Sequence, residues 1–233
     1  NARKLAYGGE RKTRTDRKYY QAAFILEPIK NWVTNIEFNY SIMDENVKET
    51  TLPAYQRDPN GNLMDASKQN SSLYQNVKKE NYMNLNAYTS YSHTFADAHN
   101  FKIMGGMQIE EMEQDFMSAS KSGLIFADLP EFNLTSGLQG NGTLKDAAIE
   151  GYSNRWATAG FFGRLNYDYK GRYLAEVNMR YDGTSRFRRD SRWKLAPSFS
   201  AGWNIAQENF WEPFADVANM LKLRASYGEL SNQ

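Results

Sequence analysis

The stretch ATAGFFGRLNYDYKGRYLAEVNMRYD, residues 157–182, decides the fold class of this chain. Apolar and polar side chains alternate along it with a period of two, on both sides of Lys170-Gly171-Arg172. A period of two places successive side chains on opposite faces of a β-strand, and a short break containing glycine joins antiparallel strands. The stretch therefore predicts a β-hairpin with one apolar and one polar face, with Phe162 as the exception on the polar side of 157–169.

The same alternation recurs along the whole chain and predicts eight strands. Most of the segments are close to the ~9–11 residues with which a tilted strand crosses a bilayer. The predicted strands are residues 19–27, 32–42, 83–95, 101–111, 157–169, 173–182, 194–205 and 221–228.

The connections between these strands alternate in length. Short ones fall at 27–31, 96–100 and 170–172, long ones at 44–80, 113–156 and 183–193, and the connection at 206–220 is intermediate. Short turns at one end and long loops at the other are typical of outer-membrane β-barrels. Within the long loops, Asp58-Pro59-Asn60-Gly61-Asn62 predicts a turn and 144–150 a short helix.

Composition removes several classes of protein. Among 233 residues, Lys and Arg number 28 and Asp and Glu 27, so the formal charge of +1 argues against a nucleic-acid binder. The absence of cysteine excludes disulfides and thiolate chemistry. The mean hydropathy is −0.73 and no apolar run approaches 18 residues, which excludes a membrane protein built of helices. A membrane β-barrel is compatible with these values because its strands alternate.

Aromatic residues make up 14% of the chain and gather near the predicted strand ends. Rings at strand ends are typical of the headgroup level of a membrane, although they also cap the cores of soluble β-proteins. We favour the membrane interpretation because the enrichment falls at the short turns. The clusters are Tyr19, Tyr20 and Trp32; Tyr167, Tyr169 and Tyr173; and Trp203, Phe210, Trp211 and Phe214.

No catalytic, cofactor or metal site is predicted. His93 and His99 lack a third ligand, so they are interpreted as structural. A calcium loop at Asp58 is rejected because its glycine falls at the fourth position and Gln69 stands at the twelfth. The acidic run Glu110, Glu111, Glu113 and Asp115 could bind a cation, but a solvated extension of a strand is favoured. Gly105-Gly106 inside a strand indicates a bulge or a tightly curved position.

The segment from Arg180 to Arg192 is the most densely charged part of the chain. Arg180, Arg186, Arg188, Arg189 and Arg192 could hold an anionic group, but Asp182 and Asp190 favour a network of ion pairs within the loop.

A series of motifs then makes the sequence recognisable. Residues 155–233 closely resemble the barrel region of the SusC/RagA family of TonB-dependent outer-membrane transporters of Bacteroidetes, in order and in spacing, whereas 1–154 match only in general style. Tyr181 and Ser231 depart from residues common in that family. The motifs are GRLNY at 163–167, KGRYL at 170–174, RYDGTSRF at 180–187, Trp193, PSFSAGW at 197–203, ENF at 208–210, LKLRASYG at 221–228 and Asn232-Gln233.

The resemblance implies an all-β fold, an antiparallel transmembrane barrel wall of about eight strands out of ~22 in a plugged barrel. Residues 1–233 are then part of one barrel domain, with the plug and the amino-terminal extension outside this chain, and both ends look cut. It also implies a bacterial outer membrane location, a SusD-like surface lipoprotein and the TonB complex as partners, oligosaccharide or peptide as substrate, and no enzymatic activity or cofactor.

Two other functions stay open, a passive outer-membrane porin and a soluble carbohydrate-binding β-sandwich. Substrate-contact residues are not predicted. Aromatic and basic residues of the expected outer loops are interpreted as loop packing or contacts with the lid, namely Tyr55, Tyr74, Phe126, Phe132, Arg186, Phe187, Arg188 and Trp193.

Overall fold

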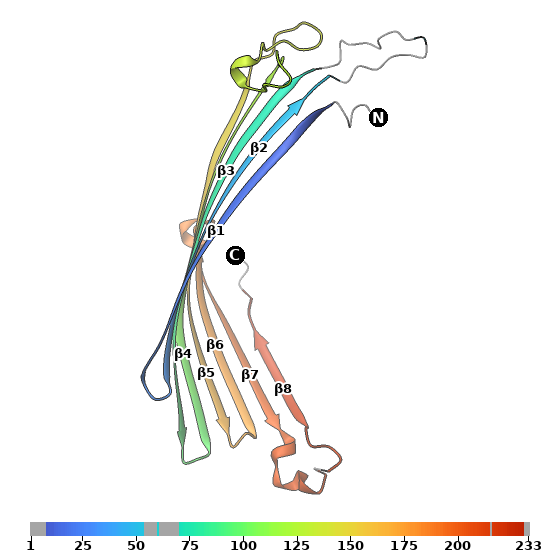
Figure 1. The fold of residues 1–233 in the computed structure, drawn as a ribbon. Helices are drawn as coiled ribbons and strands as arrows, with labels where there is room; N and C mark the ends of the chain where they lie inside the picture. Colours follow the sequence, from blue (N-terminus) through green and yellow to red (C-terminus); the bar gives the residue numbers. More distant parts are fainter. Residues whose placement is uncertain (1–7, 54–59, 61–69, 215, 231–233) are drawn as a thin grey trace. The chain divides into compact units, whose positions relative to one another are not determined.

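The computed structural model describes residues 8–53, 60, 70–214 and 216–230 (Figure 1). The part of the chain that it describes contains eight strands, in agreement with the number predicted. They are β1 (Gly9–Ile29), β2 (Trp32–Thr51), β3 (Ser72–Phe95), β4 (His99–Ser122), β5 (Ala148–Tyr169), β6 (Tyr173–Thr184), β7 (Trp193–Asn204) and β8 (Lys222–Gly228).

All eight strands belong to one sheet, in the order β1-β2-β3-β4-β5-β6-β7-β8. The pairs β5–β6, β6–β7 and β7–β8 are antiparallel. Among the described residues, the buried apolar side chains are only Val47, Leu73 and Ala98. The all-β prediction is therefore confirmed. A β-sandwich needs a second sheet and a core between the two sheets, so the soluble sandwich is contradicted for this part of the chain.

By its internal contacts the chain divides into two compact units. Unit 1 comprises residues 1–18, 41–81 and 113–154, and unit 2 comprises 19–40, 82–112 and 155–233. The boundaries of unit 2 at residues 19, 40, 82, 112 and 155 each lie within two residues of the end of a strand that alternation predicts. The two units differ in chemistry, and each is described by itself below.

The strands are longer than predicted, which corrects the predicted loops. β2 continues to Thr51 and β3 begins at Ser72, so the loop expected at 44–80 is residues 52–71. β4 continues to Ser122 and β5 begins at Ala148, so the loop expected at 113–156 is residues 123–147. The added residues belong to unit 1, where polar residues on both faces hide the period of two although the backbone ladder is intact.

The 123–147 loop differs from expectation in a second respect. The helix expected at 144–150 is absent, because Leu144 pairs in an isolated bridge with Leu138 and β5 begins four residues later. The loop contains one short 3-10 turn, η2 (Phe132–Leu134). The turn predicted at 58–62 lies outside the described residues, except for Asn60.

Two of the short connections in unit 2 are tight hairpin turns. Ala96 and Asp97 both have positive φ, and the amide of Ala98 donates to the carbonyl of Phe95. Lys170 and Gly171 also have positive φ, and the amide of Arg172 donates to the carbonyl of Tyr169. Two central residues of positive φ define the type I′ turn, whose twist matches that of the flanking strands. The predicted short turns are thus confirmed.

The remaining connections of unit 2 contain short 3-10 segments. η3 (Arg189–Ser191) lies between β6 and β7. η4 (Ile205–Gln207) and η5 (Asn209–Phe214) lie between β7 and β8. Among the described residues, no helix is long and apolar enough to cross a membrane.

Candidate functional site: two unlike faces of one sheet

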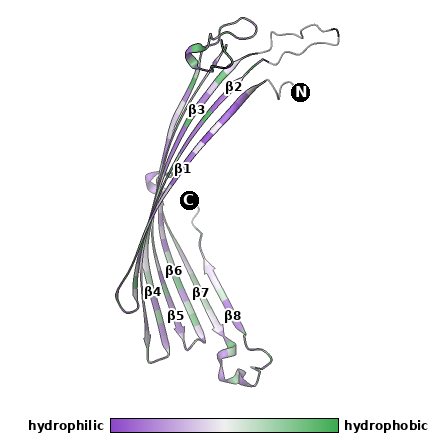
Figure 2. Cartoon of the chain, in the orientation of Figure 1, coloured by the Kyte–Doolittle hydropathy of each residue, from purple (hydrophilic) through white to green (hydrophobic). Residues whose placement is uncertain are grey.

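The register of β5–β8 separates the side chains of unit 2 into an apolar face and a polar face. Phe161 is opposite Tyr181, which is opposite Leu195, and all three belong to the apolar face. Asn166 is opposite Glu176, which is opposite Ser200, and all three belong to the polar face. The division of faces that the sequence predicts is therefore confirmed for these strands. In Figure 2, hydrophobic and hydrophilic residues follow one another along them.

The apolar face is open although its residues are large. Phe161, Leu165, Met179, Leu195, Phe199 and Leu223 are each at least 40% exposed. A soluble protein rarely exposes so large a continuous apolar surface unless another molecule covers it. The face is thus suited to contact with an apolar medium.

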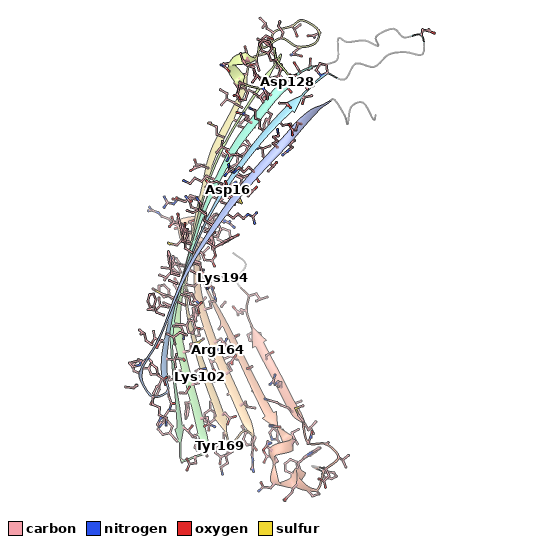
Figure 3. The ribbon with its side chains drawn as sticks, viewed as in Figure 1. Asp16, Lys102, Asp128, Arg164, Tyr169 and Lys194 are labelled. Atoms are coloured by element: carbon pink, nitrogen blue, oxygen red, sulfur yellow. The ribbon has the colours of Figure 1, made fainter. Side chains whose placement is uncertain are left out.

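A row of aromatic rings crosses the apolar face at the short-turn end. Trp32 contacts Tyr91, Phe95 contacts Phe101, Phe101 contacts Tyr167, and Tyr173 contacts both Tyr169 and Trp203, with ring centroids 4.9–6.5 Å apart. Tyr169 is labelled at this end in Figure 3. The ring contacts join strands β2 to β7, and His93 and His99 close the gaps between them. Parts of the three predicted clusters thus belong to one row, whereas Tyr20 contacts Tyr40 instead.

A second aromatic row lies at the other end of the apolar face of β5–β7. Trp193 stacks on Phe161 and on Tyr181, with centroids 6.2 and 4.9 Å apart. Gly183 leaves the space for the indole, because a Cβ at this glycine would lie 2.6 Å from the ring of Trp193. The prediction that placed Trp193 in an outer loop is wrong, since this residue begins β7.

The separation of the two rows fits a bilayer. Trp193 and Trp203 lie at opposite ends of β7, ten residues apart in the sequence. At ~3.3 Å per residue this is about 33 Å along the strand. For a strand tilted by about 40°, the rise along the membrane normal is about 25 Å, which is the height of the apolar band of membrane barrels.

The polar face carries a chain of hydrogen bonds across β3, β4 and β6. The amide groups of Asn84 and Gln108 both donate to the Glu110 carboxylate, at 3.2 and 2.9 Å. The Arg180 guanidinium donates to the Gln108 side-chain oxygen at 3.2 Å and to the Asp182 carboxylate at 2.7 Å. Asp182 is only 8% exposed, whereas about half of the Arg180 side chain is exposed, so the carboxylate is the protected partner of this ion pair.

A second group of polar side chains links β5 to β6. Asn166 and Asn178 donate to the two carboxylate oxygens of Glu176, at 2.6 and 2.7 Å. Arg164, labelled in Figure 3, donates to the Asn178 oxygen. These side chains pair with one another across the two strands, which gives a continuous polar surface.

Phe162 lies among these charges for a reason that the sequence alone does not give. The Arg180 guanidinium carbon is 6.0 Å from the centre of its ring. Beneath the ring, a Cβ at Gly106 would lie 2.7 Å from the Phe162 Cζ and 2.6 Å from the Ala87 carbonyl oxygen. The second glycine of Gly105-Gly106 therefore lets the ring cross from β5 onto β4, and the strand itself is continuous there.

Two hollows open on the polar face of unit 2. The larger, about 720 Å³, is lined by Arg164, Arg180, Asn178 and Asp182 among others. The smaller, about 450 Å³, lies toward the short-turn end and is lined by Glu176, Ser200, Lys222 and Arg224 among others. Charged and amide side chains line both hollows together with apolar ones, such as Phe162 in the larger hollow and Leu174 in the smaller.

Glu208 organises the connection that follows β7. The Trp203 indole N–H donates to its carboxylate at 3.0 Å, and the Arg172 guanidinium contacts it at 3.3 Å. Hydrogen bonds from Tyr173 and Trp203, and the charge of Arg172, lower the pKa of Glu208 below its ordinary value of 4.5, although desolvation opposes them. The carboxylate thereby joins the β5–β6 turn, the start of β6 and the end of β7. The sequence placed Glu208 in the ENF motif but predicted none of these partners.

The histidines and the acidic run take the structural positions that were favoured. His93 packs against Phe95 at 4.2 Å, and His99 is within hydrogen-bond distance of the Tyr167 hydroxyl at 2.8 Å. The acidic run lies in β4, which extends beyond 111 as predicted. Glu111 pairs with Arg155, and Asp115 accepts a hydrogen bond from Ser153.

Only part of the arginine-rich segment forms the ion pairs that the sequence predicts. Arg180 pairs with Asp182 as predicted. Arg186 instead lies 4.5 Å from the centre of the Trp156 ring, and Arg192 donates to the Phe187 carbonyl at 3.0 Å. The reciprocal bonds between Ser185 and Ala157 close the β5–β6 edge beside this loop. The segment is thus held by its own contacts.

The other outer-loop candidates do not converge on one site. Tyr74 lies in β3, where its hydroxyl accepts a hydrogen bond from Asn76. Phe132 begins η2, and Phe126 and Phe187 are exposed. Arg188 precedes η3, and Tyr55 lies outside the described residues. Their interpretation as loop packing or lid contacts stays a prediction.

Comparison with known families gives a match over nearly the whole chain. The family described as TonB dependent receptor-like, beta-barrel, matches residues 1–231. TonB-dependent receptor P26 of Formosa agariphila is 28% identical over 94% of this chain and 21% of its own length. TonB-dependent receptor SusC of Bacteroides thetaiotaomicron is 44% identical over 35% of this chain and 8% of its own length. The chain therefore spans about a fifth, or less, of the curated relatives that it matches.

Solved structures show the same fold. The chain matches a structure of the RagAB peptide transporter with a TM-score of 0.78 and 19% identity, over 96% of this chain and 23% of that one. A RagAB peptide importer in an open-open state matches with a TM-score of 0.79 and 18% identity, over the same shares. These findings confirm the resemblance to SusC/RagA-type barrels that the motifs of residues 155–233 predict.

Proposed function

The chain belongs to the TonB-dependent receptor β-barrel family, and from that premise we propose that it forms part of the wall of a bacterial outer-membrane importer. The apolar face of unit 2 contacts lipid, and the polar face lines the interior of a plugged barrel of ~22 strands. The observation that supports this proposal most strongly is the pair of aromatic rows about 25 Å apart on one face, with charges confined to the other.

Loop lengths support one orientation in the membrane. The short turns after β1, β3 and β5, and the connection between β7 and β8, face the periplasm. The 52–71, 123–147 and 185–192 loops face the exterior. In outer-membrane barrels the periplasmic turns are short and the extracellular loops are long.

The proposed cargo is an oligosaccharide or a peptide, imported at the expense of energy delivered through TonB. A SusD-like surface lipoprotein covers the barrel, and the TonB complex contacts parts of the protein outside this chain. The family match and the similarity to SusC support both partners. Two of the similar structures are described as a peptide transporter or importer, which keeps peptides beside oligosaccharides as the substrate class.

Cell fractionation tests the location and the first partner. Outer membranes of the native organism are extracted in detergent, the full-length protein is purified through an affinity tag, and co-purifying proteins are identified by mass spectrometry. We expect recovery in the outer membrane together with a surface lipoprotein. Recovery as a soluble monomer would contradict the proposal.

A passive porin is distinguished from an importer by its energy requirement. Uptake of the cargo is compared in cells with and without TonB, and with and without a protonophore. An importer loses uptake in both treatments, whereas diffusion through a porin continues. Cells that express the full-length protein with Val177→Arg serve as the assembly-defective control.

A further inference from the structure

The connection between β7 and β8, residues 205–221, is attached to the apolar side of the sheet. Its Glu208 accepts the hydrogen bond of Trp203, and the ring of Phe210 packs edge-on against Trp203 with centroids 6.4 Å apart. Trp203 is part of the aromatic row on the apolar face. Arg172 completes the attachment by donating to Asn209 at 2.6 Å. The connection therefore begins beside that aromatic row.

The connection is folded, yet it leaves apolar side chains in the open. The Trp211 indole N–H donates to the Ala218 carbonyl at 2.8 Å, and its ring packs on Phe214 at 5.5 Å. These contacts close the segment into a compact loop. Its most exposed apolar side chains are Phe210 at 59%, Phe214 at 57%, Val217 at 91% and Met220 at 80%. A preformed loop with four exposed apolar side chains needs a medium or a partner that covers them.

The charge of the connection narrows the choice of partner. It contains Glu208, Glu212 and Asp216 and has no Lys or Arg between 205 and 221. Glu208 is occupied by Arg172. The two other carboxylates repel anionic surfaces, but they complement the ammonium group of a zwitterionic phospholipid. Continuity with the aromatic row places the loop where such headgroups lie.

We propose that residues 205–221 form an interfacial anchor that inserts Phe210, Phe214, Val217 and Met220 into the headgroup region of the periplasmic leaflet and binds zwitterionic phospholipid there. The inference rests on the proposed function, because it requires the apolar face of unit 2 to contact lipid. Exposed apolar side chains at the level of the headgroups are the usual basis of binding in the plane of a membrane interface.

Fluorescence quenching in the full-length protein tests the anchor. Single-cysteine variants Phe214→Cys, Ala175→Cys and Lys30→Cys are labelled with an environment-sensitive fluorophore and reconstituted in phosphatidylcholine and phosphatidylethanolamine vesicles. Ala175 is on the apolar face of β6, and Lys30 is an exposed residue of another short turn. Quenching is measured with iodide in water and with lipids that carry a nitroxide near the headgroup. Val217→Cys and Met220→Cys replace Phe214→Cys if that variant does not assemble.

We expect the label at 214 to lose most of its iodide quenching, to shift its emission to the blue and to be quenched by the nitroxide lipid, whereas the label at 30 stays accessible to iodide. A label at 214 that behaves like the one at 30, while 175 is quenched by lipid, overturns the anchor and leaves the barrel wall intact. A label at 214 shielded from both quenchers shows a protein occupant and also overturns it. Absence of lipid quenching at 175 refutes the lipid face itself, and the anchor with it.

Discussion

The two parts of β5 differ in their pattern of apolar and polar residues although they belong to one strand. In unit 2, residues 157–169 alternate between an apolar face and a polar face. In unit 1, residues 148–154 lack that alternation, and Ser153 donates to Asp115 on β4. β1 shows the same contrast, since residues 10–18 are almost entirely hydrophilic (Figure 2). Backbone hydrogen bonds alone are thus enough to form a strand. We infer that apolar and polar side chains alternate only where one face of the strand contacts lipid.

A charge at the centre of the apolar face gives the largest expected difference between the two units. Val177 lies midway between Tyr173 and Tyr181, the residues of the two aromatic rows on β6. We expect Val177→Arg to destabilise the assembled barrel by about 2–4 kcal/mol, because a cation then lies near the bilayer midplane. The measurement is the heat-modifiable gel mobility of the full-length protein.

Met117→Arg is the matched control in unit 1. Met117 is 60% exposed on β4, and exposed substitutions usually change stability by less than about 0.5 kcal/mol. Equal defects in Met117→Arg and Val177→Arg would abolish the proposed distinction between the units.

Gly105 and Gly106 are adjacent on β4 and belong to opposite faces, so their substitutions compare the two faces. Gly106→Ala places a methyl group 2.6 Å from the Ala87 carbonyl and 2.7 Å from the Phe162 ring, and we expect a cost of about 1–3 kcal/mol. At Gly105 the nearest atom is 3.9 Å away, so Gly105→Ala should be tolerated. The urea midpoint of the full-length protein in detergent measures both, and a reversed order would show that the ring crosses elsewhere.

The next largest effect on stability is expected from breaking the Arg180–Asp182 ion pair of the polar face. Arg180→Ala leaves the Asp182 carboxylate, which is 8% exposed, without its cation. We expect a loss of about 1–2 kcal/mol, because a buried acceptor then lacks its donor. The double variant Arg180→Ala with Asp182→Asn should recover part of this loss in the same urea titration. No recovery would mean that Arg180 acts through Gln108 or Phe162 instead.

The Glu208 cluster predicts a pH effect confined to the short-turn end. The folded-state pKa of Glu208 is lowered by Tyr173, Trp203 and Arg172, so the cluster contributes full stability above the ordinary value of 4.5. The contribution is lost as the pH falls through the lowered pKa. Glu208→Gln should abolish this acid-dependent step, followed by the tryptophan emission of the full-length protein. Persistence of the step in the variant would assign it to another carboxylate.

The smallest effect is expected on the polar face of β6. Glu176→Gln keeps an oxygen for the hydrogen bond of Asn166 or Asn178 and removes only one charge of a hydrated surface. We expect a change of about 0.5 kcal/mol or less. Assembly is compared with that of Val177→Arg on the same gel, and a severe defect would show that the two faces have been exchanged.

The sequence predicts the part of the fold that has two chemically distinct sides. All eight strands, the division into faces and the aromatic clusters follow from alternation, as in 173–182. Apart from the acidic run of β4, the extensions of β1 to β5 in unit 1 were missed because polar residues on both faces leave no periodic signal. The Glu208 cluster and the Gly106–Phe162 contact were missed because each depends on residues that only the pairing of strands brings together.

A spin-label scan of β5 in the full-length protein tests the central claim most directly. Single nitroxides at each position from 149 to 169 are reconstituted in bilayers, and their collisions with oxygen and with a water-soluble nickel chelate are compared. The account predicts that oxygen accessibility oscillates with a period of two from 157 to 169, with maxima at odd positions, and that the nickel chelate reaches the positions below 155. An oscillation that continues through 149–154, or that is absent from 157–169, would contradict it.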